Sequence, residues 1–348
     1  MKVVIVGGGF CGVSVAKKLD RSPDIETVLI DQKEYFEYYP NLHKIITKPA
    51  YLKKLQVPYN SILKNTTILT EKVLTIASKY VKTQQQKILY DYLVIATGID
   101  YPILLENTQN VHVLKNGSDA LEIAKKIQQS THLLIVGGGV IGTEIAGEII
   151  TKHSTKKVTF VHSHQHLIER TSSDAWEYAE EFLTKNGVTF YFSEKIISQK
   201  EGVFLTNYNH HIFADLCIFC TGIQPNPSFM HGFEQECYSK QKFLVVNKYL
   251  QLKGYPHIFV GGDINDVDIE KTGHNAKVQG KNIAKNIINI HKEKPLEPFK
   301  KPHPIIIIGL GDLRGIIYLK RVIVGLMIPG IIKWFIEKLT IIGLKKRW

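Results

Sequence analysis

The sequence predicts an α/β fold, and two observations lead to this prediction. A run of β-branched residues ends in a glycine-rich turn near the start of the chain, and the same arrangement returns near residue 137. Each turn is followed by a segment with the apolar spacing of a helix and then by a second apolar run. Strand, glycine turn, helix and strand in this order are typical of a βαβ unit that feeds a parallel sheet. We therefore expect two domains, each built on such a sheet.

The composition is that of a globular protein. Of the 348 residues, 44% are hydrophobic and 22% are charged, which excludes wholesale disorder and a collagen-like structure. The formal net charge is +12, and residues 291–348 contribute +8 of it. A basic and apolar tail therefore follows a body with little net charge.

The cysteines and the N-terminus indicate the compartment. Four scattered cysteines are too few for a disulfide framework, which favours a reducing environment. The first apolar run begins directly after Met1 and Lys2, which leaves no room for a signal or transit peptide. We expect the mature chain to begin at Met1 and to remain in the cytoplasm.

The first βαβ unit has the turn pattern Gly7-x-Gly9-x-x-Gly12. In this pattern the first glycine permits a tight turn, the second lets a pyrophosphate approach the backbone, and the third lets the helix pack on the strand. Asp31 ends the second strand, where a carboxylate accepts hydrogen bonds from a ribose. These residues predict a dinucleotide site. The strand, helix and second strand are predicted over residues 2–6, 13–19 and 28–31.

The second unit repeats the pattern as Gly137-x-Gly139-x-x-Gly142, but His162 follows its second strand where the first unit has an acid. Without a carboxylate to repel a 2′-phosphate, the site need not exclude NADPH, and we expect both NADH and NADPH to be accepted. The alternating histidines that begin at His162 do not match a metal-ligand spacing, so we expect no metal site. The three elements are predicted over residues 133–136, 143–150 and 158–161.

Three more strands end in small residues. Residues 92–96 lead into Thr97-Gly98, residues 216–220 into Thr221-Gly222, and residues 257–260 into Gly261-Gly262-Asp263. A helix is predicted over residues 275–291, and a proline-rich linker follows it.

In this order, the motifs resemble those of flavoproteins with two dinucleotide-binding domains. The chain looks like the type II NADH:quinone oxidoreductases, in particular the branch that contains apoptosis-inducing-factor-like proteins and ferroptosis suppressor protein. The resemblance implies that the first turn binds the adenosine half of FAD and that the second turn binds NADH or NADPH. It also implies that Asp263 contacts the ribityl or pyrophosphate part of FAD. The remaining candidate cofactor residues near these motifs are Thr97, Gly98, Gly222, Gly262 and His274.

Glu144 is the candidate catalytic residue. The run Gly142-Thr143-Glu144-Ile145-Ala146-Gly147-Glu148 resembles a run of the family in which the first glutamate lies beside the stacked nicotinamide and flavin. The resemblance implies that Glu144 orients the nicotinamide or helps a proton to move. The alternative is an ordinary carboxylate on a helix surface.

Two segments differ from the patterns of related enzymes, and both bear on the identity of the electron acceptor. The segment at residues 35–42 contains no cysteine where related disulfide reductases have a redox pair, and resembles instead an aromatic and proline stretch near the flavin of quinone reductases. At residues 273–280, which include His274, only Gln279 matches the glutamine pattern of the respiratory type II enzymes. This favours the ferroptosis-suppressor-like branch and leaves the identity of the quinone open.

The tail predicts an amphipathic helix. Its longest uncharged run, residues 322–332, is shorter than the roughly 20 apolar residues that span a bilayer. After Pro329 the polar residues Gly330, Lys333, Glu337 and Thr340 fall on one face, and isoleucine, tryptophan and phenylalanine cover the rest. A wide apolar face with flanking lysines suits a helix in the membrane interface. The alternatives are a core helix or a homodimer interface.

Together these features predict an FAD-binding domain at residues 1–105 and 226–290, split by an inserted NAD(P)H-binding domain at residues 106–225. Residues 291–348 are predicted to form a membrane-docking α+β tail. The predicted activity is that of an FAD-dependent NAD(P)H:quinone oxidoreductase, peripheral on the cytoplasmic face of a membrane. The alternatives are a reductase of a protein electron carrier and a signalling flavoprotein like apoptosis-inducing factor. Because the positive charge lies in an apolar tail, no nucleic-acid partner is expected.

Overall fold

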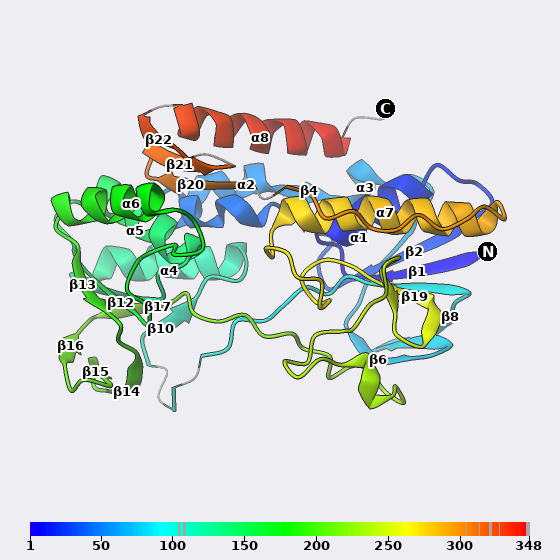
Figure 1. The fold of residues 1–348 in the computed structure, drawn as a ribbon, viewed down its shortest axis with the longest axis horizontal. Helices are drawn as coiled ribbons and strands as arrows, with labels where there is room; N and C mark the ends of the chain where they lie inside the picture. The colour runs from blue at the N-terminus through cyan, green and yellow to red at the C-terminus, as the bar shows by residue number, and fades with distance from the viewer. Residues whose placement is uncertain are drawn as a thin grey trace.

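The computed structural model describes residues 1–103, 105–106, 109–303, 305–312, 314–319, 322–326 and 328–345, with only the backbone described for residues 322–326. Two parallel sheets lie side by side in it (Figure 1). Their strands contain the two runs that precede the glycine turns, so the predicted α/β architecture is confirmed.

The first sheet has six strands in the order β18-β19-β9-β1-β2-β5. All neighbours are parallel except the short β18. The central strand β1 is almost completely buried, because both faces of the sheet are covered. The bounds are β1 Lys2–Val6, β2 Glu26–Asp31, β5 Thr67–Thr70, β9 Tyr92–Ile95, β18 Gln251–Leu252 and β19 Tyr255–Val260.

Helices α1 (Phe10–Leu19) and α7 (Gly273–His291) pack against each other on one face of this sheet. Gly280 permits the close approach, because a Cβ there would lie 2.5 Å from the carbonyl oxygen of Cys11. The other face is covered by the antiparallel sheet β6 (Val73–Ala77), β7 (Tyr80–Thr83) and β8 (Lys87–Leu89).

The second sheet repeats this arrangement with five parallel strands in the order β10-β17-β11-β12-β13. A second antiparallel sheet, β14-β15-β16, packs on it through Phe204 and Ile212. The bounds are β10 Val111–Val113, α4 Gly117–Gln129, β11 His132–Val136, α5 Val140–Lys152, β12 Lys157–His162, α6 Ser173–Lys185, β13 Thr189–Phe192, β14 Ile196–Lys200, β15 Val203–Thr206, β16 His211–Phe213 and β17 Leu216–Phe219.

The C-terminal segment forms an antiparallel sheet and a helix. Strand β20 of this sheet lies on α5, and Figure 1 shows α8 along one edge of the molecule, beside the sheet. No helix among the described residues is long and apolar enough to cross a bilayer. The bounds are β20 Ile306–Leu310, β21 Arg314–Tyr318, β22 Val322–Leu326 and α8 Ile328–Lys345.

Short elements between β2 and β5 lie close to α8 and α5. They matter because one of them, the 3-10 helix η1, contributes to the candidate site. The bounds are β3 Tyr35–Glu37, η1 Tyr39–Ile46, η2 Pro49–Tyr51, α2 Leu52–Leu55, β4 Gln56–Pro58 and α3 Tyr59–Ile62, with η3 at Gln235–Cys237 later in the chain.

Helix α8 has its polar side inside and its apolar side outside. Lys333 and Glu337 are only 7% and 3% exposed, whereas Trp334 and Phe335 are 46% and 54% exposed. This reverses the usual distribution, because charged residues are rarely buried without partners. The other exposed apolar residues of the helix are Ile328, Ile331, Ile332, Ile336, Leu339 and Ile342.

Candidate functional site

The first glycine turn connects β1 to α1 and has no room for side chains at two of its three glycines. Gly7 has a φ of +100°, and a Cβ there would lie 2.3 Å from the carbonyl oxygen of Ala96. A Cβ on Gly12 would lie 1.8 Å from the carbonyl oxygen of Gly7. By contrast, a Cβ on Gly9 would meet nothing within 4 Å, so the backbone is open at the position where a pyrophosphate would approach.

Asp31 is held in place beside this turn. Its carboxylate accepts hydrogen bonds from the backbone N–H of Gly8 at 2.6 Å and of Lys33 at 2.8 Å. Tyr59 closes the turn from the other side, because its hydroxyl donates to the carbonyl oxygen of Gly8 at 3.0 Å. The carboxylate therefore lies at the end of β2, as the sequence pattern predicts.

The first turn of α1 keeps its N–H groups available. Gly9 is the N-cap, no side chain caps the helix, and its first turn contains no acidic residue. Helix α4 is different, because Asn116 caps it and accepts from the backbone N–H of Asp119. Free N–H groups at a helix N-terminus are suited to a phosphate, so this end of α1 fits a dinucleotide.

The second turn repeats this geometry between β11 and α5. Gly137 has a φ of +109°, and a Cβ on Gly142 would lie 2.1 Å from its carbonyl oxygen. A Cβ on Gly139 would meet nothing within 4 Å, and α5 also begins without a side-chain cap. The second turn therefore fits a pyrophosphate in the same way as the first.

His162 occupies the position that corresponds to Asp31. Its Nδ1 accepts a hydrogen bond from the backbone N–H of Gly138 at 3.0 Å, as Asp31 accepts one from Gly8. Burial and the neighbouring His164 both lower the pKa of His162. A neutral ring that accepts at Nδ1 has its proton on Nε2, so the second site offers a donor where the first offers a carboxylate.

The neighbouring histidines have other partners. His164 lies 2.9 Å from Glu169, and the ring of His166 stacks on Trp176 with 3.5 Å between centroids. In the described parts of the chain, no three His, Cys, Asp or Glu side chains converge as a metal site would require.

The remaining candidate residues lie at the strand ends near the two turns. Gly98 and Gly222 have φ values of +73° and +64°, and no atom lies within 4 Å of a Cβ built on either one. Burial raises the pKa of Asp263 to about 6, and the ammonium of Lys271 opposes this shift. His274, at the start of α7, is exposed, and desolvation together with the neighbouring Lys277 lowers the pKa of its ring.

Gln279 is a residue whose structural role the sequence pattern did not predict. Its buried side-chain oxygen accepts hydrogen bonds from the backbone N–H of Gly262 at 2.8 Å and from the Asn265 side chain at 2.7 Å. It thereby fixes the loop that contains Asp263. The partial glutamine match at residues 273–280 was the one sequence signal for it.

Glu144 is 4% exposed and has three partners, which excludes the alternative of a surface carboxylate. One carboxylate oxygen accepts from the backbone N–H of Gly309 at 2.9 Å and forms an ion pair with Lys333. The other lies 3.1 Å from Nδ1 of His43. Burial by itself would raise the pKa of Glu144, but the hydrogen bond with His43 and the ammonium of Lys333 outweigh it and hold that pKa at about 2.

We call Glu144, His43, Lys333 and Glu337 the buried polar cluster. Glu337 accepts from the hydroxyl of Tyr51 at 2.7 Å and from the side chain of Asn41. Helix α8 thus contributes two of the four members, both from its inward side. The contacts of Glu144 are made by residues far away in the sequence, from His43 at 101 positions to Lys333 at 189 positions. Local sequence motifs therefore contain no signal for these contacts. The one usable signal was the spacing of Lys333 and Glu337 on a single polar face.

Comparison with known proteins shows which family has this architecture. Residues 1–280 match the model of the pyridine nucleotide-disulphide oxidoreductase family. The chain is 28% identical over 346 residues to ferroptosis suppressor protein 1 of Taeniopygia guttata, with 96% of this chain and 92% of the relative covered. It is 31% identical over 348 residues to apoptosis-inducing factor homolog A of Dictyostelium discoideum, with 90% and 84% covered.

A type II NADH:quinone oxidoreductase of Staphylococcus haemolyticus is 23% identical over 363 residues, with 91% of this chain and 90% of the relative covered. The solved structure of NDH2 from Plasmodium falciparum in complex with NADH covers all of this chain and 95% of its own, with a TM-score of 0.88 and 16% identity, and shows the same fold. The chain therefore belongs to the pyridine nucleotide-disulphide oxidoreductase family, which confirms the resemblance and the predicted cofactors, FAD and NADH or NADPH.

Proposed function

We propose that the protein is an FAD-dependent NAD(P)H:quinone oxidoreductase that works at the surface of a membrane. One observation carries this proposal: the inward side of α8 completes the contacts of Glu144, while its outward side exposes large apolar residues. One helix thus connects the candidate reaction centre to a surface suited to lipid. The relatives named as quinone oxidoreductases and ferroptosis suppressor protein support this activity.

The FAD domain comprises residues 1–105 and 226–290 in this proposal. The pyrophosphate would lie on the first turn of α1 at Gly9, where the backbone is open and the N–H groups are uncapped, and Gly12 would keep α1 close to β1. Asp31 would accept from the ribose, and Asp263 would contact the ribityl or pyrophosphate part. Gly7, Thr97, Gly98 and Gly262 would keep the surrounding backbone close to the cofactor.

The NAD(P)H domain comprises residues 106–225. The pyrophosphate of the nicotinamide nucleotide would lie at Gly137, Gly139 and Gly142, and Gly222 would border it. His162 would donate to the adenosine ribose or to a 2′-phosphate, because its neutral ring keeps a proton on Nε2. We assign no contact to His274 beyond its place at the start of α7.

When bound, FAD supplies the chemistry of accepting a hydride and passing two electrons on. The chain supplies position and charge. Glu144 is ionised because its pKa is held at about 2, so it accepts hydrogen bonds and does not donate a proton. It would orient the carboxamide of the nicotinamide, while Lys333 and Gly309 hold the carboxylate still.

His43 is the group suited to hold or move a proton. Burial lowers its pKa, so the ring is neutral, and its Nε2 has no hydrogen-bond partner among the described residues. Reduction of a quinone consumes protons, and a neutral imidazole beside an ionised carboxylate can relay one.

The membrane-docking role belongs to residues 291–348. The exposed apolar side of α8 would lie in the interface region of a bilayer on the cytoplasmic face, with Trp334 and Phe335 among the lipid. A quinone dissolved in that bilayer would then reach the flavin without crossing water.

The test is turnover by the purified, flavin-loaded protein. Oxidation of NADH and of NADPH is followed with a short-chain quinone, with a ferredoxin, and with a long-chain quinone in liposomes. Faster oxidation with quinone than with ferredoxin, increased further by liposomes, supports the proposal. A preference for ferredoxin, or no quinone-dependent rate at all, contradicts it.

A further inference from the structure

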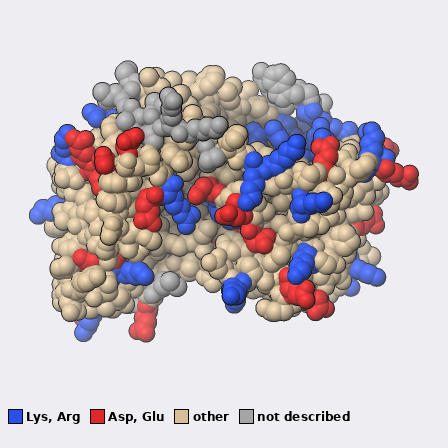
Figure 2. Space-filling model, in the orientation of Figure 1, with Lys and Arg blue, Asp and Glu red and all other residues tan. Residues whose placement is uncertain are grey.

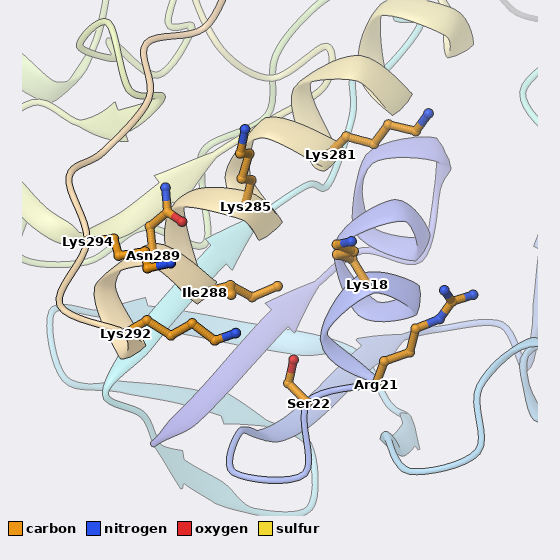
Figure 3. Close-up of a pocket in the computed structure, with 9 residues that line it drawn as sticks. All are labelled: Lys18, Arg21, Ser22, Lys281, Lys285, Ile288, Asn289, Lys292 and Lys294. Carbon is orange, nitrogen blue, oxygen red and sulfur yellow. The ribbon is translucent and has the colours of Figure 1, made fainter. Parts of the chain in front are cut away.

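A basic groove of about 700 Å³ lies between α1 and α7, apart from both glycine turns. Figure 3 shows side chains from the end of α1 and the residues after it on one side of the groove, and from α7 and the residues after it on the other. The glycine turn precedes α1, so this groove lies toward the opposite end of the helix. Its basic residues are Lys18, Arg21, Lys281, Lys285, Lys292 and Lys294.

The groove has an excess of positive charge with little neutralisation. Lys285 pairs with Glu297 at 2.5 Å. The other five cations have no ion-pair partner in the part of the chain that the structure describes, and no carboxylate lines the groove. Cations gathered without counter-charges repel one another, so an anion between them would stabilise the arrangement.

Helix α1, which borders the groove, also contacts the end of α8. Lys17, next to Lys18 on α1, donates to the carbonyl oxygens of Gly343 and Leu344, at 2.7 Å for Leu344. The C-terminal turn of α8 is therefore packed on the helix that forms one wall of the groove. Figure 2 shows lysine and arginine side chains gathered over α7, close to the edge where Figure 1 places α8.

We propose that this groove binds the phosphate groups of anionic phospholipids, so that the protein docks preferentially on negatively charged bilayers. The inference rests on the membrane docking by α8 proposed above and adds the charge of the lipid as a requirement. Basic residues next to an apolar face are the usual combination at an anionic membrane surface.

The lining favours lipid over nucleic acid. The remaining lining residues are Ser22, Ile288 and Asn289, so no aromatic side chain is available for a base to stack on. Ile288 suits an acyl chain near the headgroup instead.

The experiment is flotation of the full-length, flavin-loaded protein with two kinds of vesicle, phosphatidylcholine alone and an equimolar mixture with phosphatidylglycerol. The test variant is Lys18→Gln/Lys281→Gln/Lys292→Gln. The matched control is Lys195→Gln/Lys200→Gln/Lys240→Gln, which removes three exposed lysines elsewhere on the surface.

Each lysine near an anionic surface contributes about a fivefold gain in partitioning, so the test variant should bind the anionic vesicles about 100-fold more weakly. The control variant should bind them as the natural protein does, and both variants should bind phosphatidylcholine equally. High salt should reduce the binding of the natural protein to the anionic vesicles and leave its binding to phosphatidylcholine vesicles unchanged.

The outcomes separate the two proposals. If the natural protein binds both kinds of vesicle equally well, the role of the groove is wrong and docking by α8 stands. If it binds neither, docking by α8 itself is wrong. If inorganic phosphate protects the natural protein from heat more than the test variant and the vesicles show no charge preference, the groove is a site for a soluble anion and the inference is overturned. Salt-sensitive binding to duplex DNA that the test variant loses, again with no preference among vesicles, would overturn it in favour of nucleic acid.

Discussion

The two glycine turns have the same backbone and different chemistry. In both, the residue after the first glycine of the pattern is itself a glycine and donates its N–H to the residue that ends the next strand, Gly8 to Asp31 and Gly138 to His162. Two residues after the last glycine, the first unit has Ser14, whose hydroxyl donates to the Phe10 carbonyl oxygen at 2.6 Å, and the second has the buried Glu144.

We infer from this difference that the turn provides only the phosphate site. The residue at the strand end would decide what kind of ribose group is tolerated, and the residue on the helix would decide whether the unit takes part in the reaction. Substitutions at matched positions should therefore have different effects in the two units.

The largest effect is expected from the last glycine of each turn. Gly12→Val would force side-chain atoms into the Gly7 carbonyl oxygen, and the protein should be purified without bound flavin and without activity. Gly142→Val should retain the flavin and raise the KM for NADH at least about tenfold. Flavin absorbance and steady-state kinetics measure both. Equal loss of flavin in the two variants would contradict the assignment of the turns.

The next effect compares Glu144 with Ser14. Glu144→Gln should lower kcat/KM with NADH about 100-fold, equivalent to roughly 3 kcal/mol of transition-state stabilisation. Ser14→Ala, at the matched position, should stay within about twofold, since it loses only a hydrogen bond within its own helix.

A stability measurement separates chemistry from folding at Glu144. Removing its charge leaves Lys333 buried and unpaired, which should lower the free energy of unfolding by about 3–5 kcal/mol. The double variant Glu144→Gln/Lys333→Met should regain most of this stability in urea unfolding and none of the activity. If activity returned together with stability, the role of Glu144 would be structural only.

The third effect concerns the strand ends. His162→Asp would place a carboxylate where the first unit has Asp31, and it should lower kcat/KM for NADPH about tenfold or more while leaving NADH almost unchanged. Steady-state kinetics with both nucleotides at one pH measure the ratio of kcat/KM for NADPH to kcat/KM for NADH. A natural protein that already rejects NADPH, or a ratio unchanged in the variant, would sink the idea that His162 determines this preference.

The smallest effect is a pH dependence at Asp263, beside the first turn. Its pKa is about 6 in the folded state against 3.8 in its ordinary state, so the folded protein binds a proton more tightly. The contribution of Asp263 to stability is therefore greatest below its ordinary pKa and falls by about 1–3 kcal/mol as the pH rises through this window. Thermal unfolding of the natural protein and of Asp263→Asn between pH 4 and pH 7 tests this. The variant should show a flatter profile, and parallel profiles would refute the prediction.

The sequence allowed the two turns to be predicted closely because each is encoded within a few neighbouring residues. Gly7 to Asp31 and Gly137 to His162 are short stretches whose glycine spacing is typical of the turn in a βαβ unit. The buried polar cluster could not be predicted in this way. Glu144 meets Lys333 across 189 positions of chain, and nothing local to either residue specifies the other. Only tertiary packing of η1, α5, β20 and α8 brings them together.

The late position of α8 also bears on how the protein is made. Lys333 and Glu337 leave the ribosome after both βαβ units have emerged and can fold. A nascent chain could thus bind both dinucleotides while Glu144 still lacks its ammonium partner. The proposed reaction centre would be completed only after α8 has emerged, which delays redox turnover until the exposed apolar side of that helix exists.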